Sequence, residues 1–305
     1  MQSTANSTAQ PVPDTVDAAP TILITGATGN VGSEVTKLLI QQGVHFRAMV
    51  RDPKKVPELT ALAGVEVVAG DFNDPDALGQ ALRGIRRAFL LTPSSEQAEA
   101  QQLHFVDQAK QAGVQHIVKL SQLAANPTSP VRFLRYHAVV EQAIRESGMA
   151  FTFLRPNLFM QGLLTFRDSI AQQGKFFAAI GDAKISLVDV RDIAAAATTA
   201  LTEPGHVDKI YTLTGPEAIT HAQVADELST VLGHSVTFVD IPATIMRSEL
   251  AKIGFPDWQA DGLIEDYAHY SRNEAAAVEP GVNEATGRPP RSFTTFAHDY
   301  ASAFS

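Results

Sequence analysis

The chain of 305 residues contains no cysteine, and this absence excludes disulfide bridges, thiolate metal ligands and cysteine nucleophiles. It also contains no apolar run near the roughly 18 residues that a membrane-spanning helix requires. The histidines are scattered and the acidic residues show no paired spacing, so we expect no metal site. The net charge of −9 argues against a surface that binds nucleic acid directly.

The remaining composition is that of a globular protein with a sizeable core, because 45% of the residues are hydrophobic and 19% are charged. Residues 1–20 differ from the rest, since they lack lysine and arginine and are rich in Ser, Thr, Ala, Gln and Pro. A secretory signal needs a basic start and a hydrophobic middle, and a transit peptide usually carries arginine. We therefore predict a disordered N-terminal tail over 1–20 and a cytoplasmic protein.

The most informative stretch of the chain is 21–32, which reads TILITGATGNVG. The apolar run Ile22 to Ile24 predicts a buried strand, and the apolar spacing after the turn predicts a helix. Gly26 can adopt a backbone conformation that other residues resist, Gly29 lets a pyrophosphate approach the main chain, and Gly32 lets the helix pack close to the strand. A tight turn whose glycines serve packing alone is the alternative. We predict cofactor contacts here from Gly26, Thr28, Gly29, Asn30, Val31 and Gly32.

Predicted strands and helices alternate regularly from residue 21 to residue 155. This alternation implies an α/β fold with a doubly wound parallel sheet of the Rossmann type, whose strands all end at one edge where ligands bind. Beyond residue 155 the rhythm loosens, and we expect 156–305 to form a smaller α/β lobe that binds substrate over this edge. The strands expected in 21–155 are Ile22–Ile24, His45–Val50, Val65–Ala69, Ala88–Leu91, His116–Leu120 and Phe151–Leu154.

Arg51 directly follows the second predicted strand, at the position that meets the adenosine ribose in dinucleotide-binding folds. An acidic residue there would accept a hydrogen bond from the 2′-hydroxyl of NAD, whereas an arginine would pair with the 2′-phosphate of NADP. Lys55 is close enough in sequence to help, and Asp52 leaves NAD as the alternative. The pattern favours NADP(H) over NAD(H).

The next strand ends bring further side chains to the same edge. Asp71 follows the third strand, where its carboxylate would accept from an adenine amino group while Phe72 flanks the base, and a helix-capping aspartate is the alternative. Thr92 and Pro93 follow the fourth strand and would lie beside the nicotinamide ribose. Ser121 follows the fifth strand, where its hydroxyl would contact substrate or nicotinamide, or would serve only the turn.

Seven motifs stand out along the chain, namely LITGATGNVG at 23–32, VRDP at 50–53, GD at 70–71, FLRPN at 153–157, VDVRDIA at 188–194, LTGPE at 213–217 and TGRPP at 286–290. Together they resemble atypical short-chain dehydrogenase/reductases, in particular the NmrA-like group. The resemblance covers about 21–304, and this combination is more specific than the glycine turn, which the wider superfamily shares. With it we include Pro156 and Asn157 among the predicted cofactor contacts.

The chain departs from the catalytic members of that superfamily on the helix after the fifth strand. Those members carry Tyr-x-x-x-Lys, in which the lysine lowers the pKa of the tyrosine and holds the ribose. Here Val140 stands four residues after Tyr136, so the lysine is missing. His137 and Glu141 stand one turn apart on one helix face, which resembles NmrA-like quinone and dye reductases. The histidine can donate a proton near neutral pH while the carboxylate orients it or raises its pKa, and an ordinary surface pair is the alternative.

The resemblance and the missing lysine together imply an NADPH-dependent reductase of quinones or related aromatic electrophiles, because solvent can protonate a quinone product after hydride transfer. The alternative is a non-catalytic NADP(H) sensor that binds a regulatory protein partner, as some NmrA-like members do. A homodimer is also compatible with the sequence, whereas a sugar-nucleotide epimerase or dehydratase would need the absent lysine. Residues that would line a pocket for a flat substrate, or pack within the second lobe, are Asn157, Phe159, Met160, Phe166, Phe176 and Phe177.

Overall fold

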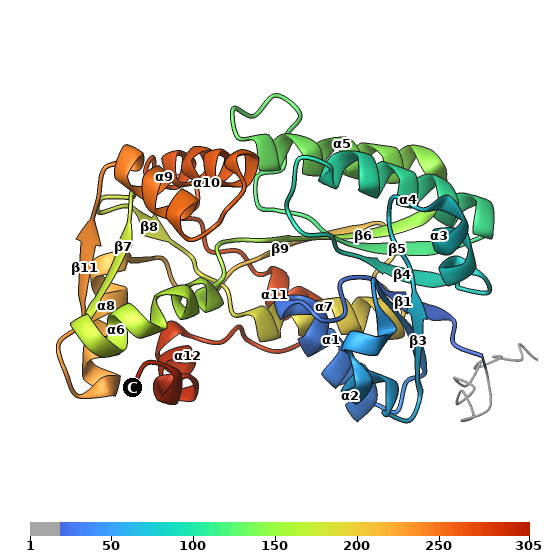
Figure 1. The fold of residues 1–305 in the computed structure, drawn as a ribbon, viewed down its shortest axis with the longest axis horizontal. Coiled ribbons are helices and arrows are strands. Elements are labelled where there is room, and N and C mark those ends of the chain that lie inside the picture. The colour runs from blue at the N-terminus through green and yellow to red at the C-terminus, as the bar shows by residue number, and fades with distance from the viewer. Residues whose placement is uncertain (1–18) are drawn as a thin grey trace, which may run out of the picture.

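The computed structural model describes residues 19–305, so the tail predicted over 1–20 lies, up to residue 18, outside the described residues. A parallel sheet of seven strands forms the centre of the structure, in the order β3-β2-β1-β4-β5-β6-β9 (Figure 1). This order, with helices on both faces, confirms the predicted doubly wound α/β fold. The strands are β1 (Ile22–Ile24), β2 (Phe46–Val50), β3 (Val65–Ala69), β4 (Arg87–Leu90), β5 (His116–Leu120), β6 (Ala150–Pro156) and β9 (Lys209–Leu213).

The central strands form because their sequences are short apolar runs that can be buried on both faces of a sheet. Every residue of β1 is buried, and so is every residue of β5. β1 pairs with both β2 and β4, so the glycine turn after β1 lies near the middle of the sheet's C-terminal edge. Because the strands run parallel, the segments after β2, β3, β4 and β5 all begin at that same edge.

Helices cover both faces of the sheet (Figure 1). On one face α1 packs against α7, and the core beneath them includes Val35 and Leu39 of α1. On the other face α4 packs between α3 and α5, with Phe105 of α4 and Val140 of α5 in the core. The bounds are α1 (Asn30–Gln41), α3 (Pro75–Leu82), α4 (Ala98–Ala112), α5 (Arg132–Ser147), α7 (Val190–Thr202) and α11 (Gly281–Thr286), with the short η1 (Pro53–Lys55) and α2 (Pro57–Thr60) after β2.

The division between the two parts of the chain differs from the one predicted at residue 155. β6 extends to Pro156, and β9 pairs with it in the same sheet. α7 and α11 also pack on this sheet, because small residues let them approach closely. A Cβ at Gly281 of α11, for example, would lie 2.2 Å from the carbonyl oxygen of Thr212 in β9. The sheet layer therefore takes residues from both sides of 155, and the chain leaves it and returns.

The second part lies beyond the C-terminal edge of the sheet and has an apolar core of its own (Figure 1). It contains two small sheets, in which β7 pairs with β11 in parallel and β8 pairs with β10 antiparallel. The elements are η2 (Met160–Phe166), α6 (Arg167–Gln173), β7 (Lys175–Ala178), β8 (Lys184–Ile185), β10 (Ile219–Thr220), α8 (His221–Leu232), β11 (Thr237–Asp240), α9 (Ala243–Lys252), α10 (Asp257–Tyr270), α12 (Phe293–Asp299) and η3 (Ala301–Ala303).

Helix α10 joins the two parts. Its Glu265 accepts hydrogen bonds from Arg132 at the start of α5, including one from Nη2 to Oε1 at 2.7 Å. Its buried Asp266 accepts two from Gln122 Nε2, just after β5, at 2.8 and 3.0 Å. These contacts hold the second part over the edge where the strands end. Within residues 19–305, no helix combines the length and apolar character that crossing a membrane requires.

Candidate functional site

The turn between β1 and α1 contains three glycines in three different environments. Gly26 has a φ of +64°, a left-handed conformation that favours glycine. A Cβ at Gly32 would lie 2.0 Å from the carbonyl oxygen of Gly26, so a side chain there would push the helix away from the turn. A Cβ at Gly29 would meet nothing closer than that same oxygen, at 3.4 Å. The space beside Gly29 is therefore open to a ligand.

The N-terminus of α1 faces this open space with its amides available. Gly29 is the N-cap of the helix and contributes no side-chain hydrogen bond. The first N–H groups of any helix lack carbonyl partners, and the helix dipole favours negative charge beside them. Thr25, which sequence analysis did not single out, anchors the turn because its Oγ1 donates to the carbonyl oxygen of Phe89 at 2.9 Å and accepts from the N–H of Leu91 at 2.8 Å. The arrangement fits a pyrophosphate group.

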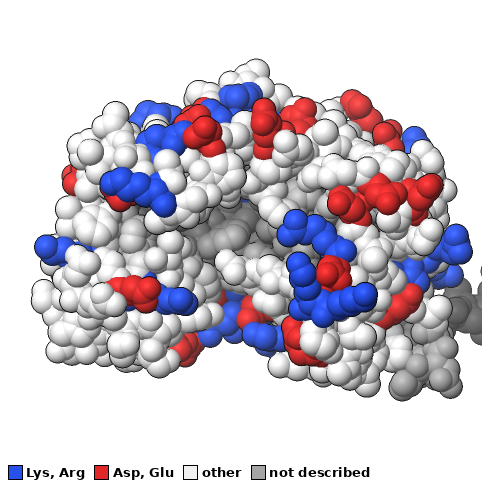
Figure 2. Space-filling view, viewed as in Figure 1, with Lys and Arg blue, Asp and Glu red and all other residues white. Residues whose placement is uncertain are grey.

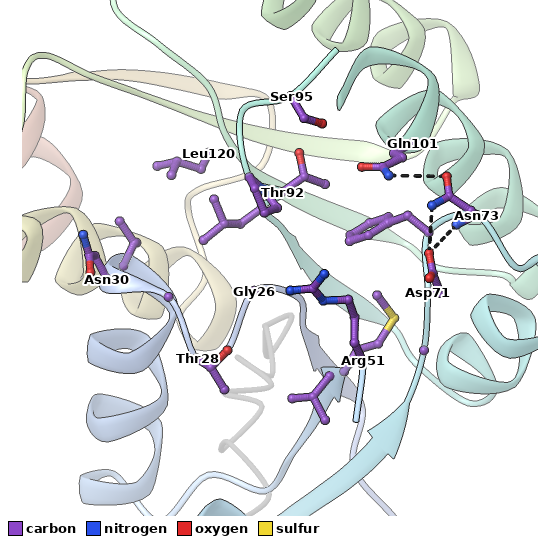
Figure 3. Close-up of a pocket in the computed structure, with 18 of the residues that line it drawn as sticks. Gly26, Thr28, Asn30, Arg51, Asp71, Asn73, Thr92, Ser95, Gln101 and Leu120 are labelled. Carbon is purple, nitrogen blue, oxygen red and sulfur yellow. Dashed lines mark hydrogen bonds between the residues drawn. The ribbon is translucent and has the colours of Figure 1, made fainter. Parts of the chain in front are cut away.

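A cleft of about 710 Å³ runs along the sheet's C-terminal edge beside this turn (Figure 3). Most of the predicted cofactor contacts line it, namely Gly26, Thr28, Gly29, Asn30, Val31, Arg51, Asp71, Phe72, Thr92 and Pro93. Residues that sequence analysis did not connect with the cofactor also line it, namely Met49, Val50, Gly70, Asn73, Leu91, Ser95, Gln101, Leu120 and Phe159. Most of these flank the strand ends already identified, so their position in the sequence was the available signal.

Arg51 extends into the cleft between the glycine turn and Asp71 (Figure 3). Its neighbour Asp52 is occupied elsewhere, because it is the N-cap of η1 and accepts from the N–H of Lys54 at 3.1 Å. Lys55 is exposed and does not line the cleft. Figure 2 shows lysine and arginine side chains gathered beside the hollow between the two parts of the molecule. The cation that enters the cleft here is therefore Arg51, with no carboxylate from Asp52 beside it.

Asp71 lines the cleft and keeps part of its carboxylate free. Its Oδ1 accepts from the main-chain N–H of Asn73 at 2.8 Å and from Asn73 Nδ2 at 3.0 Å, as Figure 3 shows. The helix cap considered as an alternative belongs to Asp74, whose Oδ1 accepts from the first amides of α3. Phe72 lies beside Asp71 and packs against Phe105, with 5.9 Å between ring centroids. An acceptor and an aromatic face thus stand together at this end of the cleft.

Three of the predicted contacts belong to the frame around the cleft. Gly32 lies behind the turn, and Pro156 is buried at the end of β6, where its carbonyl accepts from the N–H of Leu123 at 2.9 Å. The amide of Asn157 donates to Ser186 Oγ at 2.8 Å and to the carbonyl oxygen of Ala275 at 2.9 Å. Since that amide is fully engaged, Asn157 ties β6 to the second part and does not line the cleft.

A buried chain of hydrogen bonds leads away from Thr92 at the cleft. Gln102 Nε2 donates to Thr92 Oγ1 at 2.7 Å, which leaves the hydroxyl hydrogen of Thr92 free for a ligand. Lys119 Nζ donates to Gln102 Oε1 at 2.7 Å and lies 2.8 Å from His137 Nδ1. Lys119 was not among the predicted site residues, although a lysine inside the apolar strand HIVKL is an unusual feature of the sequence. His137 is thus connected to the cleft through polar side chains.

The predicted pair His137 and Glu141 is buried, and the two side chains have separate partners. Glu141 accepts from Ser121 Oγ at 2.6 Å and from Arg155 Nε and Nη2 at 2.9 and 2.5 Å. His137 is beside the Lys119 ammonium, and burial with that nearby charge holds its pKa well below the usual range. The structure therefore does not agree with the prediction that Glu141 orients His137 or raises its pKa, because the Glu141 carboxylate is hydrogen-bonded to Arg155 instead.

Tyr136 is buried and lies in an environment that disfavours its ionised form. Burial raises the pKa of Tyr136 to about 12, and its hydroxyl lies 3.3 Å from Ser94 Oγ. Its ring packs on His137, with 4.2 Å between ring centroids. Without a cation beside its oxygen, this tyrosine is a poorer acid than a free phenol, consistent with the missing lysine at Val140.

A second, smaller cavity of about 60 Å³ lies beyond Phe159, which lines both spaces. Aromatic and aliphatic side chains form its wall, and His221 and Tyr267 are among the residues that line it. Met160 is buried in the core of the second part, so it packs within the lobe and lines neither space. The predicted pocket residues that border the small cavity are Phe159, Phe166, Phe176 and Phe177.

Comparison with known proteins gives a consistent result. The model of the NmrA-like family matches residues 18–297. The chain is 40% identical over 283 residues to the NAD(P)H azoreductase of Xenophilus azovorans, covering 93% of this chain and 99% of that protein. It is 38% identical over 285 residues to the (4-alkanoyl-5-oxo-2,5-dihydrofuran-3-yl)methyl phosphate reductase of Streptomyces griseus, covering 93% and 99%. The solved structure of the NADPH-dependent quinone oxidoreductase of Escherichia coli with NADPH superimposes with a TM-score of 0.82 at 31% identity, covering 91% and 99%.

Proposed function

The chain belongs to the NmrA-like family, and we propose that it is an NADPH-dependent reductase of quinones or related electron-poor conjugated molecules. The observation that carries the cofactor half of this proposal is Arg51 in the cleft, with Asp52 engaged as a helix cap. An arginine at the adenosine end of a dinucleotide cleft, with no carboxylate from Asp52 beside it, suits the 2′-phosphate that distinguishes NADP from NAD.

Different residues of the cleft would bind different parts of the cofactor. The open space beside Gly29 and the amides of α1 would hold the pyrophosphate. Arg51 would pair with the 2′-phosphate, and Asp71 would accept from the adenine amino group beside Phe72. Thr92, whose oxygen already accepts from Gln102, would donate its hydroxyl hydrogen to the cofactor at the far end. Leu120 and Phe159 line that end and would exclude water from the nicotinamide.

The substrate half of the proposal rests on the activated tyrosine that this site lacks. A bound reduced nicotinamide supplies a hydride, and the acceptor must then carry the resulting negative charge. Tyr136, with its pKa raised to about 12, is poorly suited to protonate a strongly basic alkoxide. A quinone or an azo compound spreads the charge over a conjugated system and needs less help. The relatives named above reduce azo compounds, a conjugated lactone or quinones, and this agrees with the same class of substrate.

Calorimetric titration with NADPH, NADP and NAD tests the cofactor half. Wild type should bind NADPH more tightly than NAD, and Arg51→Ala should lose about tenfold to a hundredfold of its NADPH affinity, because a hydrogen-bonded charge pair contributes roughly 1.5–3 kcal/mol. NAD affinity should barely change. Arg86→Ala is the matched control, since Arg86 is exposed at the opposite end of the sheet. Equal losses for NADPH and NAD in Arg51→Ala would place the 2′-phosphate contact elsewhere.

Turnover tests the substrate half. NADPH oxidation is followed with menadione, p-benzoquinone and methyl red as acceptors, and with a simple aliphatic ketone as the negative control. The conjugated acceptors should be reduced and the ketone should not. NADPH binding without oxidation by any acceptor would reject the reductase and favour the sensor, whose affinity for a protein partner should then differ between NADP and NADPH.

A further inference from the structure

Lys119 lies in β5 with its side chain fully buried, although lysine is among the residues least often found in protein interiors. Its Nζ reaches three acceptors. These are Gln102 Oε1 at 2.7 Å, the carbonyl oxygen of Leu120 at 3.1 Å and His137 Nδ1 at 2.8 Å. An ammonium group has three N–H donors and no acceptor, so this environment satisfies each of them.

Two of these partners can only accept, whereas His137 can also donate. When Lys119 is an ammonium, it donates to Nδ1 of His137, and the single proton of the neutral imidazole must lie on Nε2. When Lys119 is a neutral amine, its two N–H groups can still serve Gln102 and Leu120, and its lone pair can accept from Nδ1–H. Both protonation states therefore keep every hydrogen bond, and the imidazole differs between them only in its tautomer.

The other ring nitrogen of His137 is available. Among residues 19–305, His137 Nε2 has no hydrogen-bond partner. This atom is also not fully buried, so it retains some exposure to solvent. The Tyr136 ring packs on the imidazole at 4.2 Å between centroids and limits its rotation. Nε2 is consequently the ring nitrogen of this pair that solvent or a ligand can reach, although His137 itself does not line the cleft of about 710 Å³.

We propose that Lys119 is a positioning and proton-supplying residue, which holds His137 as the neutral Nε2–H tautomer and replaces the proton that the imidazole gives up. The delivery step rests on the proposed reductase function. After hydride transfer from the reduced nicotinamide, the substrate oxygen or nitrogen bears an electron pair and takes the proton from Nε2. An ammonium proton of Lys119 passes to Nδ1 in the same step. The products are a protonated substrate, a neutral Lys119 amine and a neutral His137 with its proton on Nδ1.

The charges around the pair suit a proton supply near neutral pH. Burial lowers the pKa of Lys119 to about 7, and the carboxylate of Glu141 on α5 opposes that shift. Burial holds the pKa of His137 well below its usual range, and the positive charges of Lys119 and of Arg155 on β6 lower it further. Gln102, which faces the pair from α4, is uncharged. The imidazole therefore stays neutral while Lys119 gains and loses its proton.

Nuclear magnetic resonance of the ¹⁵N-labelled imidazoles tests the pair without turnover. The protein has nine histidines, and His137 is assigned by the signals that disappear in His137→Gln. In wild type the ring should report Nε2–H at low pH and Nδ1–H at high pH, with a midpoint near 7 and no doubly protonated form between. In Lys119→Met, a substitution of similar shape, this exchange of tautomers should vanish, while Lys110→Met on the exposed side of α4 should retain it.

Several outcomes would overturn the proposal. A wild-type His137 that is Nδ1–H throughout the titration, or that becomes doubly protonated near neutral pH, contradicts it, and this measurement needs no Lys119 variant to fold. Activity provides a second, separate readout. With menadione and NADPH, kcat in wild type should fall as pH rises past 7, and in Lys119→Met it should be at least about tenfold lower and independent of pH over this range, with the KM for NADPH little changed. An unchanged profile in Lys119→Met would reject the delivery step. A wild type that oxidises no NADPH would instead reject the reductase function, while the tautomer measurement still decides the pair.

Discussion

The glycine turn allows a test that separates folding from cofactor binding, by comparing Gly32→Ala with Gly29→Ala. In Gly32→Ala the new Cβ would lie 2.0 Å from the carbonyl oxygen of Gly26, against roughly 3.5 Å for a relaxed contact. The helix α1 must then move by more than about 1 Å, and it packs against α7 over a large apolar area. Overpacking of a core usually costs about 1–3 kcal/mol, and we expect the upper end because the opposing atom belongs to the main chain.

In Gly29→Ala the new Cβ meets only the Gly26 oxygen at 3.4 Å, and the backbone of Gly29, with φ of −83°, suits alanine. An N-cap glycine replaced by alanine costs about 1 kcal/mol or less, and the loss of freedom in the unfolded chain offsets part of that. The methyl group, however, occupies the space that a pyrophosphate would take. We expect NADPH affinity to fall by more than about tenfold, or 1.4 kcal/mol.

The assays are thermal unfolding of the two apo proteins and calorimetric titration with NADPH. Gly32→Ala should unfold about 6 °C below wild type, since roughly 2 °C per kcal/mol is usual for a chain of this size. Gly29→Ala should unfold within about 2 °C of wild type and bind NADPH poorly. A Gly29→Ala protein that binds NADPH like wild type would refute the assignment of this space to the pyrophosphate. A Gly32→Ala protein as stable as wild type would refute the packing argument.

Three further expectations follow from the buried groups. Tyr136→Phe should keep most of the reductase activity, because burial raises the pKa of that phenol to about 12, and a loss above about tenfold in kcat would identify it as the acid. Glu141→Gln should lose about 2 kcal/mol in denaturant unfolding, since it leaves the half-buried guanidinium of Arg155 without its carboxylate, and wild-type stability would contradict this. Burial lowers the pKa of His221 to about 4, so the unfolded chain takes up that proton first as pH falls through 6.5, and stability is lost from there down to about 4. His221→Phe should therefore lose about 2 kcal/mol less than wild type in denaturant unfolding between pH 7 and pH 5, and an equal loss would show that His221 is not the group that titrates.

Much of the fold could be predicted because its signals are local. Ile22–Ile24 and His116–Leu120 are apolar runs of strand length, and Gly113 and Gly148 end the helices before β5 and β6 in the left-handed conformation that glycine favours. The glycine turn follows the same logic, since a strand, a turn and a helix that are contiguous in sequence must be contiguous in space. The position of Arg51 could be predicted for the same reason, because it is the first residue after β2.

The boundary at 155 was beyond local reasoning. Nothing in the sequence of β9 or α7 states that the chain returns to the first sheet, because a strand pattern does not name its partner. The return is decided by which apolar faces complete the same core, and α7 completes the face that α1 began. Asn157 shows the same limit at the scale of one side chain. Its amide partners, Ser186 and Ala275, lie 29 and 118 residues away in sequence.

The chemistry of α5 depends on a contact of this distant kind. Helical spacing places His137 and Glu141 on one face, yet it says nothing about what approaches that face. Arg155 of β6 is hydrogen-bonded to the Glu141 carboxylate, and Lys119 of β5 is hydrogen-bonded to the His137 imidazole. In the superfamily the ammonium group comes from a lysine four residues after the tyrosine on the same helix. Here it comes from Lys119 of strand β5, and it lies beside His137, the residue that follows Tyr136. In this arrangement the proton source, Lys119, lies in the core next to the proton donor, His137. Tyr136 has no comparable partner. With Val140 in place of the helix lysine, the group best placed to give up a proton is therefore the Lys119–His137 pair and not Tyr136.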